Sequence, residues 1–429
     1  MLGKRCRELI PALLRNQPFR RYWSASTVSM FGDQVSAMAV PLTAVLVLHA
    51  DAAQMGYLTA LQWLPSLLFG LHAGAWADRR GRRRHTMIAA DLGRAALLAT
   101  IPVLCAFGAL RLWHLYAAAF ATGTLSILFN VSDGTLFVSL VEPEQYVDGQ
   151  SLIYVSRALS FVGGPSVGGL LVQFLTAPFA IAADALSFIG SALFLSGIRP
   201  AEPPADGGAG SVTAGVTFIA RSSIVRASLS GIAVINFFNM MFSALFMLYA
   251  VRVLHLRADV LGIVLGIGAC GGFLGSILTK SLSRRTGLGW ACVAGCLAFT
   301  APLALVPLAS FARGGAVLAL LFGAEFVSGF GVMLLDISVG AIFAEVIPDT
   351  LRSRVTGAFQ AINFGTRPPG AMLGGILGTE FGLSRTLWIA VAGGVCGALL
   401  LLPSPLPGLR LPATLSSLPP ESEMPESGK

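Results

Sequence analysis

Long apolar stretches, separated by short polar segments, set the pattern of this chain. Twelve of them have about 20 residues, the length at which an α-helix crosses a hydrocarbon core about 30 Å thick. The alternation of a half-buried strand is missing, and only helices or closed barrels satisfy the backbone inside lipid. The pattern therefore predicts an all-α membrane protein of about twelve transmembrane helices. The predicted spans are 22–47, 55–77, 86–109, 115–140, 151–175, 178–198, 227–251, 260–280, 290–311, 314–340, 352–378 and 383–402.

Two polar segments divide the pattern. One lies between the sixth and seventh spans and is rich in Pro, Gly and Asp. The other is the tail, whose Pro, Ser and Glu residues cannot bury enough apolar surface to fold, so we expect it to be disordered. The predicted organisation is a basic cytoplasmic segment (1–21), a six-helix bundle (22–198), a cytoplasmic linker (199–226), a second six-helix bundle (227–402) and a cytoplasmic tail (403–429).

The two halves repeat each other at a constant offset of 206 residues. The matches run from the first loop to the fifth helix: His49 with His255, Gly56 with Gly262, Arg79 and Gly81 with Arg285 and Gly287, Gly123 with Gly329, Asn130 with Asp336, Ser132 with Ser338, Gly134 with Gly340, Phe137 with Phe343, and Gly164, Gly168 and Gly169 with Gly370, Gly374 and Gly375. A single offset over this length predicts two pseudo-symmetric bundles in parallel, the plan of a transporter whose site lies between its halves.

Composition supports a membrane protein and changes the meaning of the net charge. The chain is 55% hydrophobic and 12% charged, whereas soluble domains are about 25% charged. The net charge of +8 does not indicate a nucleic-acid partner, because the basic residues cluster beside apolar runs. With the N-terminus inside, 21 of the 29 basic residues fall on the inner side and 5 on the outer side. Since inner loops carry the excess of Lys and Arg, we predict an inner-membrane protein with both termini cytoplasmic.

The loop between the second and third spans carries a motif. Its residues are Gly74, Asp78, Arg79, Arg80, Gly81, Arg82 and Arg83. The pattern resembles the G-x-x-x-D-[RK]-x-G-[RK]-[RK] loop of the major facilitator superfamily at every defined position. The resemblance implies that Asp78 latches the two halves in the outward-facing state, near the start of the eleventh helix, where a carboxylate is favoured. In the second half Arg284 replaces the acid, so only one latch looks complete. A plain positive-inside loop is the alternative.

The fifth span contains Gly164-Pro165-Ser-Val-Gly168-Gly169, which resembles the core of the antiporter motif of drug exporters in this superfamily. Proline interrupts a helical hydrogen bond and glycines allow close approach, so a bent, tightly packed helix is expected. Ordinary packing is the alternative. Three further patterns resemble the branch with macrolide-efflux and enterobactin-exporter-like proteins: Gly32-Asp33, Asp91-Leu-Gly-Arg94 and Asp184-Ala-Leu-Ser-Phe188. The fourth helix lacks the arginine of many proton-coupled drug antiporters, so their coupling scheme does not carry over.

Ionisable residues inside a membrane are costly and are candidates for function. Asp33 lies about 18 Å into the first helix and Glu325 about 16 Å into the tenth, near the middle of the membrane. The resemblance implies that helices 1, 4, 7 and 10 line a central cavity, so both carboxyl groups would face one pathway. A low dielectric disfavours the charged form of a carboxyl group, which suits a proton carrier. Pairing with a buried arginine and binding of a cationic substrate are the alternatives.

Other buried polar residues complete the candidates. Asp133, Asp336 and Arg367 are further transport or proton-coupling candidates, and Arg367 precedes Pro368-Pro369 at a predicted break in helix 11. Substrate-cavity candidates are Asn130, Asn236, Asn239 and Phe242, although phenylalanines more often pack in a core. We expect Asp91, Arg94 and Arg157 to form structural ion pairs and Asp184 to pack against another helix.

These features predict a secondary transporter that exports amphiphilic organic molecules of drug, macrolide or siderophore type by alternating access. No nucleotide-binding loop of the form G-x-x-x-x-G-K-[ST] and no catalytic dyad occurs in the sequence, so a proton gradient is the expected driving force, without cofactor, metal or enzymatic activity. The expected partners are the lipid bilayer and a small organic substrate, with the protein acting as a monomer. An importer or lipid flippase on the same fold, or a non-transporting receptor or scaffold, are the alternatives.

Overall fold

The computed structural model describes residues 12–80, 82–199 and 212–408, and the side chains of residues 12, 71–80, 212–215, 349, 350 and 353 are not among those described. The described parts are helical and contain no strand. The first half comprises α2 (Gln17–Leu46), α3 (Ala52–Arg80), α4 (Arg83–Ala106), α5 (Leu112–Leu140), α6 (Tyr146–Leu175) and α7 (Ala177–Ser196). The second comprises α9 (Ser223–Arg252), α10 (Ala258–Thr286), α11 (Leu288–Thr300), α12 (Leu305–Leu308), α13 (Gly315–Val346), α14 (Asp349–Gly365), α15 (Arg367–Glu380) and α16 (Leu383–Leu399).

Short elements join or extend these helices. The 3-10 turns η3 (Ala301–Ala304) and η4 (Ala309–Phe311) continue α11 and α12 into one span, and α14 and α15 together form another. The described residues thus contain twelve spans, as predicted, six in each half. The remaining elements are η1 (Ala12–Arg15), η2 (Pro143–Gln145), α8 (Val212–Arg221) and η5 (Leu406–Gly408).

The apolar character of the helices fits a bilayer. By length and composition, eight of the described spans are long and apolar enough to cross a membrane. The α14–α15 span is divided by a break, and α16 has only 17 helical residues. Large apolar side chains such as Phe107, Phe174 and Phe311 are about four-fifths exposed, which is favourable only where they face lipid.

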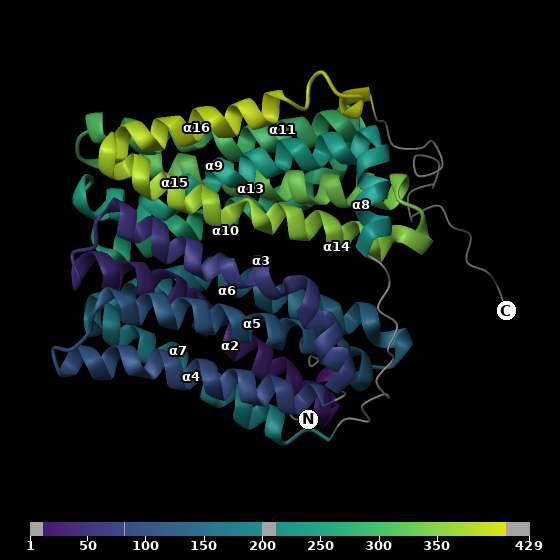
Figure 1. Ribbon diagram of the computed structural model, residues 1–429, viewed down its shortest axis with the longest axis horizontal. Coiled ribbons are helices and arrows are strands. Elements are labelled where there is room, and N and C mark those ends of the chain that lie inside the picture. Colours follow the sequence, from purple (N-terminus) through teal and green to yellow (C-terminus); the bar gives the residue numbers. More distant parts are fainter. Residues whose placement is uncertain (1–11, 81, 200–211, 409–429) are drawn as a thin grey trace, which may run out of the picture.

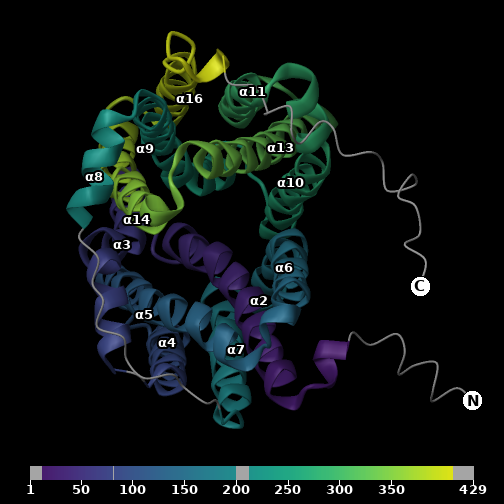
Figure 2. The same cartoon turned by 90° about the vertical axis from the view of Figure 1, so that its right-hand side faces the viewer.

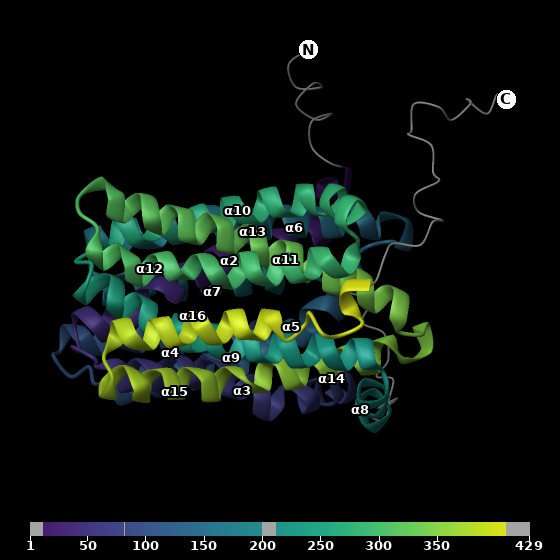
Figure 3. The same cartoon turned by 90° about the horizontal axis from the view of Figure 1, so that it is seen from above.

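The halves form two stacked bundles (Figure 1), with their helices running along one axis (Figure 3). Their backbones repeat at the predicted offset. His49 and His255 both adopt left-handed geometry, with φ of 52° and 53°. Gly108 and Gly314 form the next such pair, with φ of 64° and 57°. Thr176 repeats as Gly382 (φ 70° and 85°). A non-glycine residue rarely adopts positive φ, so its recurrence at the same offset confirms the internal repeat.

Helix breaks occur where proline requires them. The α14–α15 span breaks at Thr366, directly before Arg367 and Pro368, as predicted. The α11–η4 span changes to 3-10 geometry around Pro302 and again directly after Leu308, beyond Pro307. Proline removes a helical hydrogen bond and clashes with the preceding turn, so these spans are segmented.

The two halves touch mainly at the end of the molecule opposite the chain termini. There α6 packs on α10 and α3 on α15, and Figure 2 shows α6 beside α10 on one flank of the molecule and α3 beside α14 on the other. One buried hydrophobic cluster at this end spans both halves and includes Leu42, Leu58, Leu245 and Leu261. At the terminal end the core divides into separate clusters, with Phe19 and Phe137 in one half and residues such as Phe343 in the other. The molecule is therefore sealed between its halves at one end, which we call the sealed end.

Candidate transport site

Several predicted residues meet in a pocket of the first bundle. The pocket has a volume of about 190 Å³ and is lined by Asp33 from α2, Asn130 and Asp133 from α5, and Arg157 from α6. Asp33 lies near the middle of α2, but its side chain is exposed because it faces this pocket. We call this space the outer pocket.

The polar groups of the outer pocket are only partly paired. Asp133 lies near the Tyr22 hydroxyl and the Arg157 guanidinium. One of its carboxylate oxygens, Oδ1, has no hydrogen-bond partner among the described residues, although it is buried. Arg157 itself is exposed, and its guanidinium lies 5.8 Å from the Tyr154 ring centroid. The pocket therefore combines two acids, two bases and two amides with aromatic surface, which suits a ligand with polar and apolar parts.

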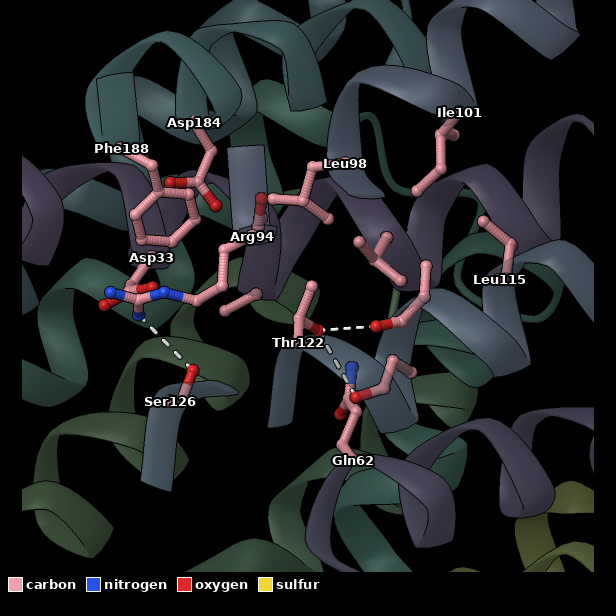
Figure 4. A pocket seen from close by; sticks show the side chains of 15 residues that line it. Asp33, Gln62, Arg94, Leu98, Ile101, Leu115, Thr122, Ser126, Asp184 and Phe188 are labelled. Atoms are coloured by element: carbon pink, nitrogen blue, oxygen red, sulfur yellow. Dashed lines mark hydrogen bonds between the residues drawn. The ribbon is translucent and has the colours of Figure 1, made fainter. Parts of the chain in front are cut away.

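Behind Asp33, a second cavity of about 110 Å³ lies inside the same bundle (Figure 4). We call it the inner cavity. Arg94 borders both spaces and is almost fully buried. Its guanidinium pairs with Asp91 on the same helix and donates to Ser126 Oγ at 3.3 Å. This confirms the predicted pairing of Asp91 with Arg94.

Two aromatic rings hold the Arg94 guanidinium. Its carbon lies 4.0 Å from the ring centroid of Phe188 on α7 and 4.6 Å from that of Phe129 on α5. Cation–π contacts of this kind are worth about 2 kcal/mol when desolvated. α5 carries no arginine of its own in this region. Arg94 from α4 therefore places a fixed positive charge beside α5.

Asp184 completes the inner cavity from α7 (Figure 4). It is 1% exposed and accepts a hydrogen bond from Ser187 Oγ at 3.0 Å. Gly32 lies directly against it: a Cβ there would come within 2.3 Å of Asp184 Oδ1. Gly32 therefore permits α7 to approach α2 beside Asp33. The predicted packing of Asp184 against another helix is confirmed, and the structure adds its place on a cavity wall.

The acidic candidates of the second half are more separated. Glu325 on α13 is half-buried and lies against α10, where a Cβ on Gly268 would be 3.2 Å from Glu325 Oε2. Among the described residues, Glu325 forms no ion pair. Asp336, lower on α13, is exposed and interacts electrostatically with Arg367. The structure therefore does not bring Glu325 into the pockets around Asp33.

Arg367 makes a contact between the halves that the sequence did not predict. Its guanidinium carbon lies 4.1 Å from the ring centroid of Trp63 on α3 and 4.6 Å from that of Phe364. The Trp63 and Phe364 rings themselves are 6.0 Å apart. The break at Thr366 places this group across the α3–α14/α15 contact. Trp63 had no sequence signal beyond being an aromatic residue in an apolar run.

The amide and aromatic candidates of α9 lie within the second bundle. Asn236 donates to the Ile232 carbonyl oxygen at 3.0 Å. Asn239 and Phe242 border a small cavity of about 10 Å³. Phe242 is buried and stacked on Phe246, with ring centroids 5.9 Å apart. Its position favours core packing over substrate contact.

The glycine motif of α6 contributes to the sealed end. A Cβ on Gly164 or Gly168 would meet Gln34 or Val35 of α2. On Gly169 it would lie 2.4 Å from the Ala258 carbonyl oxygen of the other half. Of the loop motif, Arg82 is exposed and Arg83 half-buried. Gly81 and the side chains at 74, 78 and 79 lie outside the described residues, so the latch remains a sequence prediction.

Comparison with known proteins gives the family. Residues 22–365 match the Major Facilitator Superfamily. The chain is 25% identical to the uncharacterized MFS-type transporter YfiS of Bacillus subtilis, with 91% of this chain and 92% of YfiS covered. It is 27% identical to the multidrug efflux pump Tap of Mycobacterium tuberculosis, with the same two coverages.

A solved structure shares the fold. A bacterial homologue of the iron transporter ferroportin, in its inward-facing state, matches with a TM-score of 0.73 at 17% identity, covering 92% of this chain and 99% of that one. The outward-facing state of such a homologue matches with a TM-score of 0.58 at 16% identity, covering 90% and 98%. The chain therefore belongs to the Major Facilitator Superfamily and is a multi-pass membrane transporter.

Proposed function

We propose that this transporter exports amphiphilic organic molecules across the inner membrane, driven by a proton gradient. The observation that carries the proposal is the outer pocket, where Asp33 and Asp133 meet aromatic and amide groups inside the first bundle. The 27% identity to Tap, a multidrug efflux pump, supports export. Glu325 is the acid of the second half that we assign to the same pathway once the halves rock.

The conformation fits one step of such a cycle. With the termini in the cytoplasm, as we propose, the sealed end would face outward and the conformation would be an inward-facing state. The better match to the inward-facing homologue than to the outward-facing one supports an inward-facing conformation. In the export step the sealed end would open and the Asp78 latch would close the cytoplasmic end. We propose that one chain performs this cycle as a monomer.

The test is substrate-induced proton flux in proteoliposomes of the purified protein, screened over hydrophobic cations, neutral macrolides and siderophores. We expect one of these classes to discharge an imposed pH gradient and to accumulate against its own gradient. The control is Glu144→Gln, an exposed acid on η2. Accumulation in the opposite direction would identify an importer, and movement of labelled lipid a flippase. Absence of any flux would favour a receptor or scaffold and overturn the proposal.

A further inference from the structure

Arg367 carries a positive charge whose N–H donors find no protein acceptor. Its guanidinium contacts the rings of Trp63 and Phe364, with its carbon 4.1 Å and 4.6 Å from the two ring centroids. Aromatic rings attract a cation through their electrons but offer no oxygen or nitrogen acceptor. The Arg367 side chain forms no hydrogen bond or ion pair with any described residue, and its Nε is buried without a partner. The guanidinium is therefore held in place but not satisfied.

The acid beside Arg367 does not fill this role. Asp336 interacts with Arg367 electrostatically, but no ion pair joins the two side chains among the described residues. Asp336 is exposed although it belongs to the α13 span. A charged group inside a span faces a water-filled space and not lipid. Asp336 therefore marks a water-filled approach along which a ligand can reach the guanidinium.

Arg367 lies well inside a span and at a contact between the halves. α15 has 14 residues, so Arg367, at its start, lies about 20 Å along the helix from the end at Glu380. Trp63 belongs to α3 of the first half, and α3 packs on both α14 and α15. In the proposed cycle this contact changes when the halves rock. A group bound to Arg367 would therefore be held where the two halves move against each other.

The internal repeat shows that the helix contact does not need the arginine. At the 206-residue offset the three residues of this group have small or apolar equivalents, which are Ala269 for Trp63, Ala158 for Phe364 and Phe161 for Arg367. The equivalent helices, α6 and α10, still pack closely on each other. The charge at Arg367 is therefore an addition on one side of the molecule and not a requirement of the fold.

We infer that Arg367 binds an oxyanion of the transported molecule, such as a carboxylate. A guanidinium fork matches the two oxygens of such a group and forms charge-assisted hydrogen bonds with them. Trp63 and Phe364 act as positioning residues that hold the fork, and their rings offer apolar surface beside the anion. The inference rests on the proposed function, whose substrate class it narrows to acidic amphiphiles.

A cationic substrate is the competing hypothesis for the same group of residues. In that case the two rings would bind the cation of the substrate, and Arg367 would fill their place only until the substrate arrives. The structure favours the anion, because the rings are already occupied whereas the N–H donors of Arg367 are not.

The test is equilibrium binding to the purified full-length protein in detergent, without a pH gradient. The probe is radioactive naphthylacetate, and its uncharged amide, naphthylacetamide, is the matched ligand. Arg367→Gln removes the charge, Arg367→Lys keeps the charge without the fork, and Asp336→Asn removes the neighbouring negative charge. The control variant is Arg313→Gln, at an exposed arginine before α13. Melting temperatures identify the variants that fold.

We expect saturable binding of naphthylacetate that is about tenfold tighter than that of the amide and about tenfold or more weaker in Arg367→Gln. The loss should be smaller in Arg367→Lys and absent in Arg313→Gln. Asp336→Asn should tighten binding a few fold, because it removes a like charge beside the anion. If Arg367→Gln does not fold, opposite changes in Arg367→Lys and Asp336→Asn carry the same test.

Three results would overturn the inference. They are no saturable binding by the wild type, equal affinity for the acid and the amide, and equal binding by the wild type and the folded Arg367 variants. Tighter binding of naphthyltrimethylammonium in Arg367→Gln would assign the rings to a cation instead. Because binding is measured without transport, anion binding by a protein that exports nothing would contradict only the proposed export. Export of neutral or cationic compounds without anion binding would contradict only the inference.

Discussion

At the residue scale, the position of a side chain relative to its neighbours decides what it can do. Asp33, Asp133 and Asn130 were predicted from depth and polarity, and the structure brings them to one pocket. Asp184 was predicted only to pack against another helix, because its place beside Asp33 depends on Gly32 allowing α7 to approach α2. Such a contact between distant segments has no periodic signal along the chain.

The first residue prediction concerns coupling. A proton carrier must change its charge during the cycle, which a permanently neutral amide cannot do. Asp33→Asn should therefore reduce uphill export driven by a pH gradient to background while sparing some downhill exchange, and Glu325→Gln should do the same if Glu325 shares the pathway. The measurement is flux in proteoliposomes at matched expression, with Glu144→Gln as the control.

Two other results would assign these acids different roles. Selective loss of cationic substrates would indicate substrate binding, and poor expression would indicate structural pairing, since a lone buried charge is costly. Wild-type uphill flux in both variants would remove proton coupling through these residues.

A second residue prediction concerns the Trp63–Arg367 contact. The cation–π pair joins the halves in this state and should contribute about 0.5–2 kcal/mol. Trp63→Leu should lower the melting temperature in detergent more than Trp388→Leu, a change at a partly exposed tryptophan of α16. A double-mutant cycle with Arg367→Gln isolates the pair. Strict additivity of the two changes would show that the contact contributes nothing.

At the element scale, two equivalent helix pairs close the sealed end. A Cβ on Gly169 of α6 would come within 2.4 Å of the Ala258 oxygen. One on Gly375 of α15, its repeat partner, would come within 2.8 Å of the Ala52 oxygen. The sequence predicted tight packing by these glycines from the motif and the offset. It could not predict which helix they touch. Gly164 and Gly168 pack on α2 of the same half, whereas Gly169 packs on α10 of the other half.

The glycine prediction follows from this geometry. Gly169→Ala should push α6 from α10 and disfavour the state in which this end is sealed by about 1–2 kcal/mol, roughly tenfold in population. Labelling of a cysteine placed at Ala52 by an impermeant maleimide, in a background without native cysteines, should become faster. Gly134→Ala is the control, since a Cβ there meets nothing within 4 Å. Equal labelling rates in both variants would mean that the close contact does not hold the halves together.

The latch prediction concerns the opposite end. If Asp78 stabilises the outward-facing state through the start of α14 and nearby arginines, Asp78→Asn should leave membrane insertion intact and sharply lower transport. A carboxylate near a helix N-terminus is worth about 0.3–1 kcal/mol, so the outward-facing population should fall by a few fold. Transport rate and expression level are the measurements. Unchanged transport at normal expression would reduce the loop to a topology signal.

At the scale of the whole molecule, the twelve-span count, the two bundles and the repeat could be predicted because each depends on patterns that run along the chain. The segmentation of the α11–η4 span was not predicted, although Pro302 and Pro307 lie within it. The difference between the cavities of the two halves was also not predicted. Asp184 borders a cavity of about 110 Å³, whereas the equivalent residue Ala390 borders one of about 10 Å³. The size of each cavity can be known only when all six helices of a bundle are placed.

The last prediction is the orientation of the molecule, which decides the direction of the cycle. Basic residues divide 21 to 5 between the two sides, and in the structure α2 begins, and α8 and α14 lie, at the end opposite the sealed one (Figure 1). Reporter fusions after Arg226 and in the tail should therefore both report the cytoplasm, whereas a fusion at Arg111, between α4 and α5, should report the exterior. A tail outside the cell would make the sealed end cytoplasmic and the structure outward-facing. The acids of the first bundle would then be open to the exterior in this state, and uptake would replace export as the better interpretation.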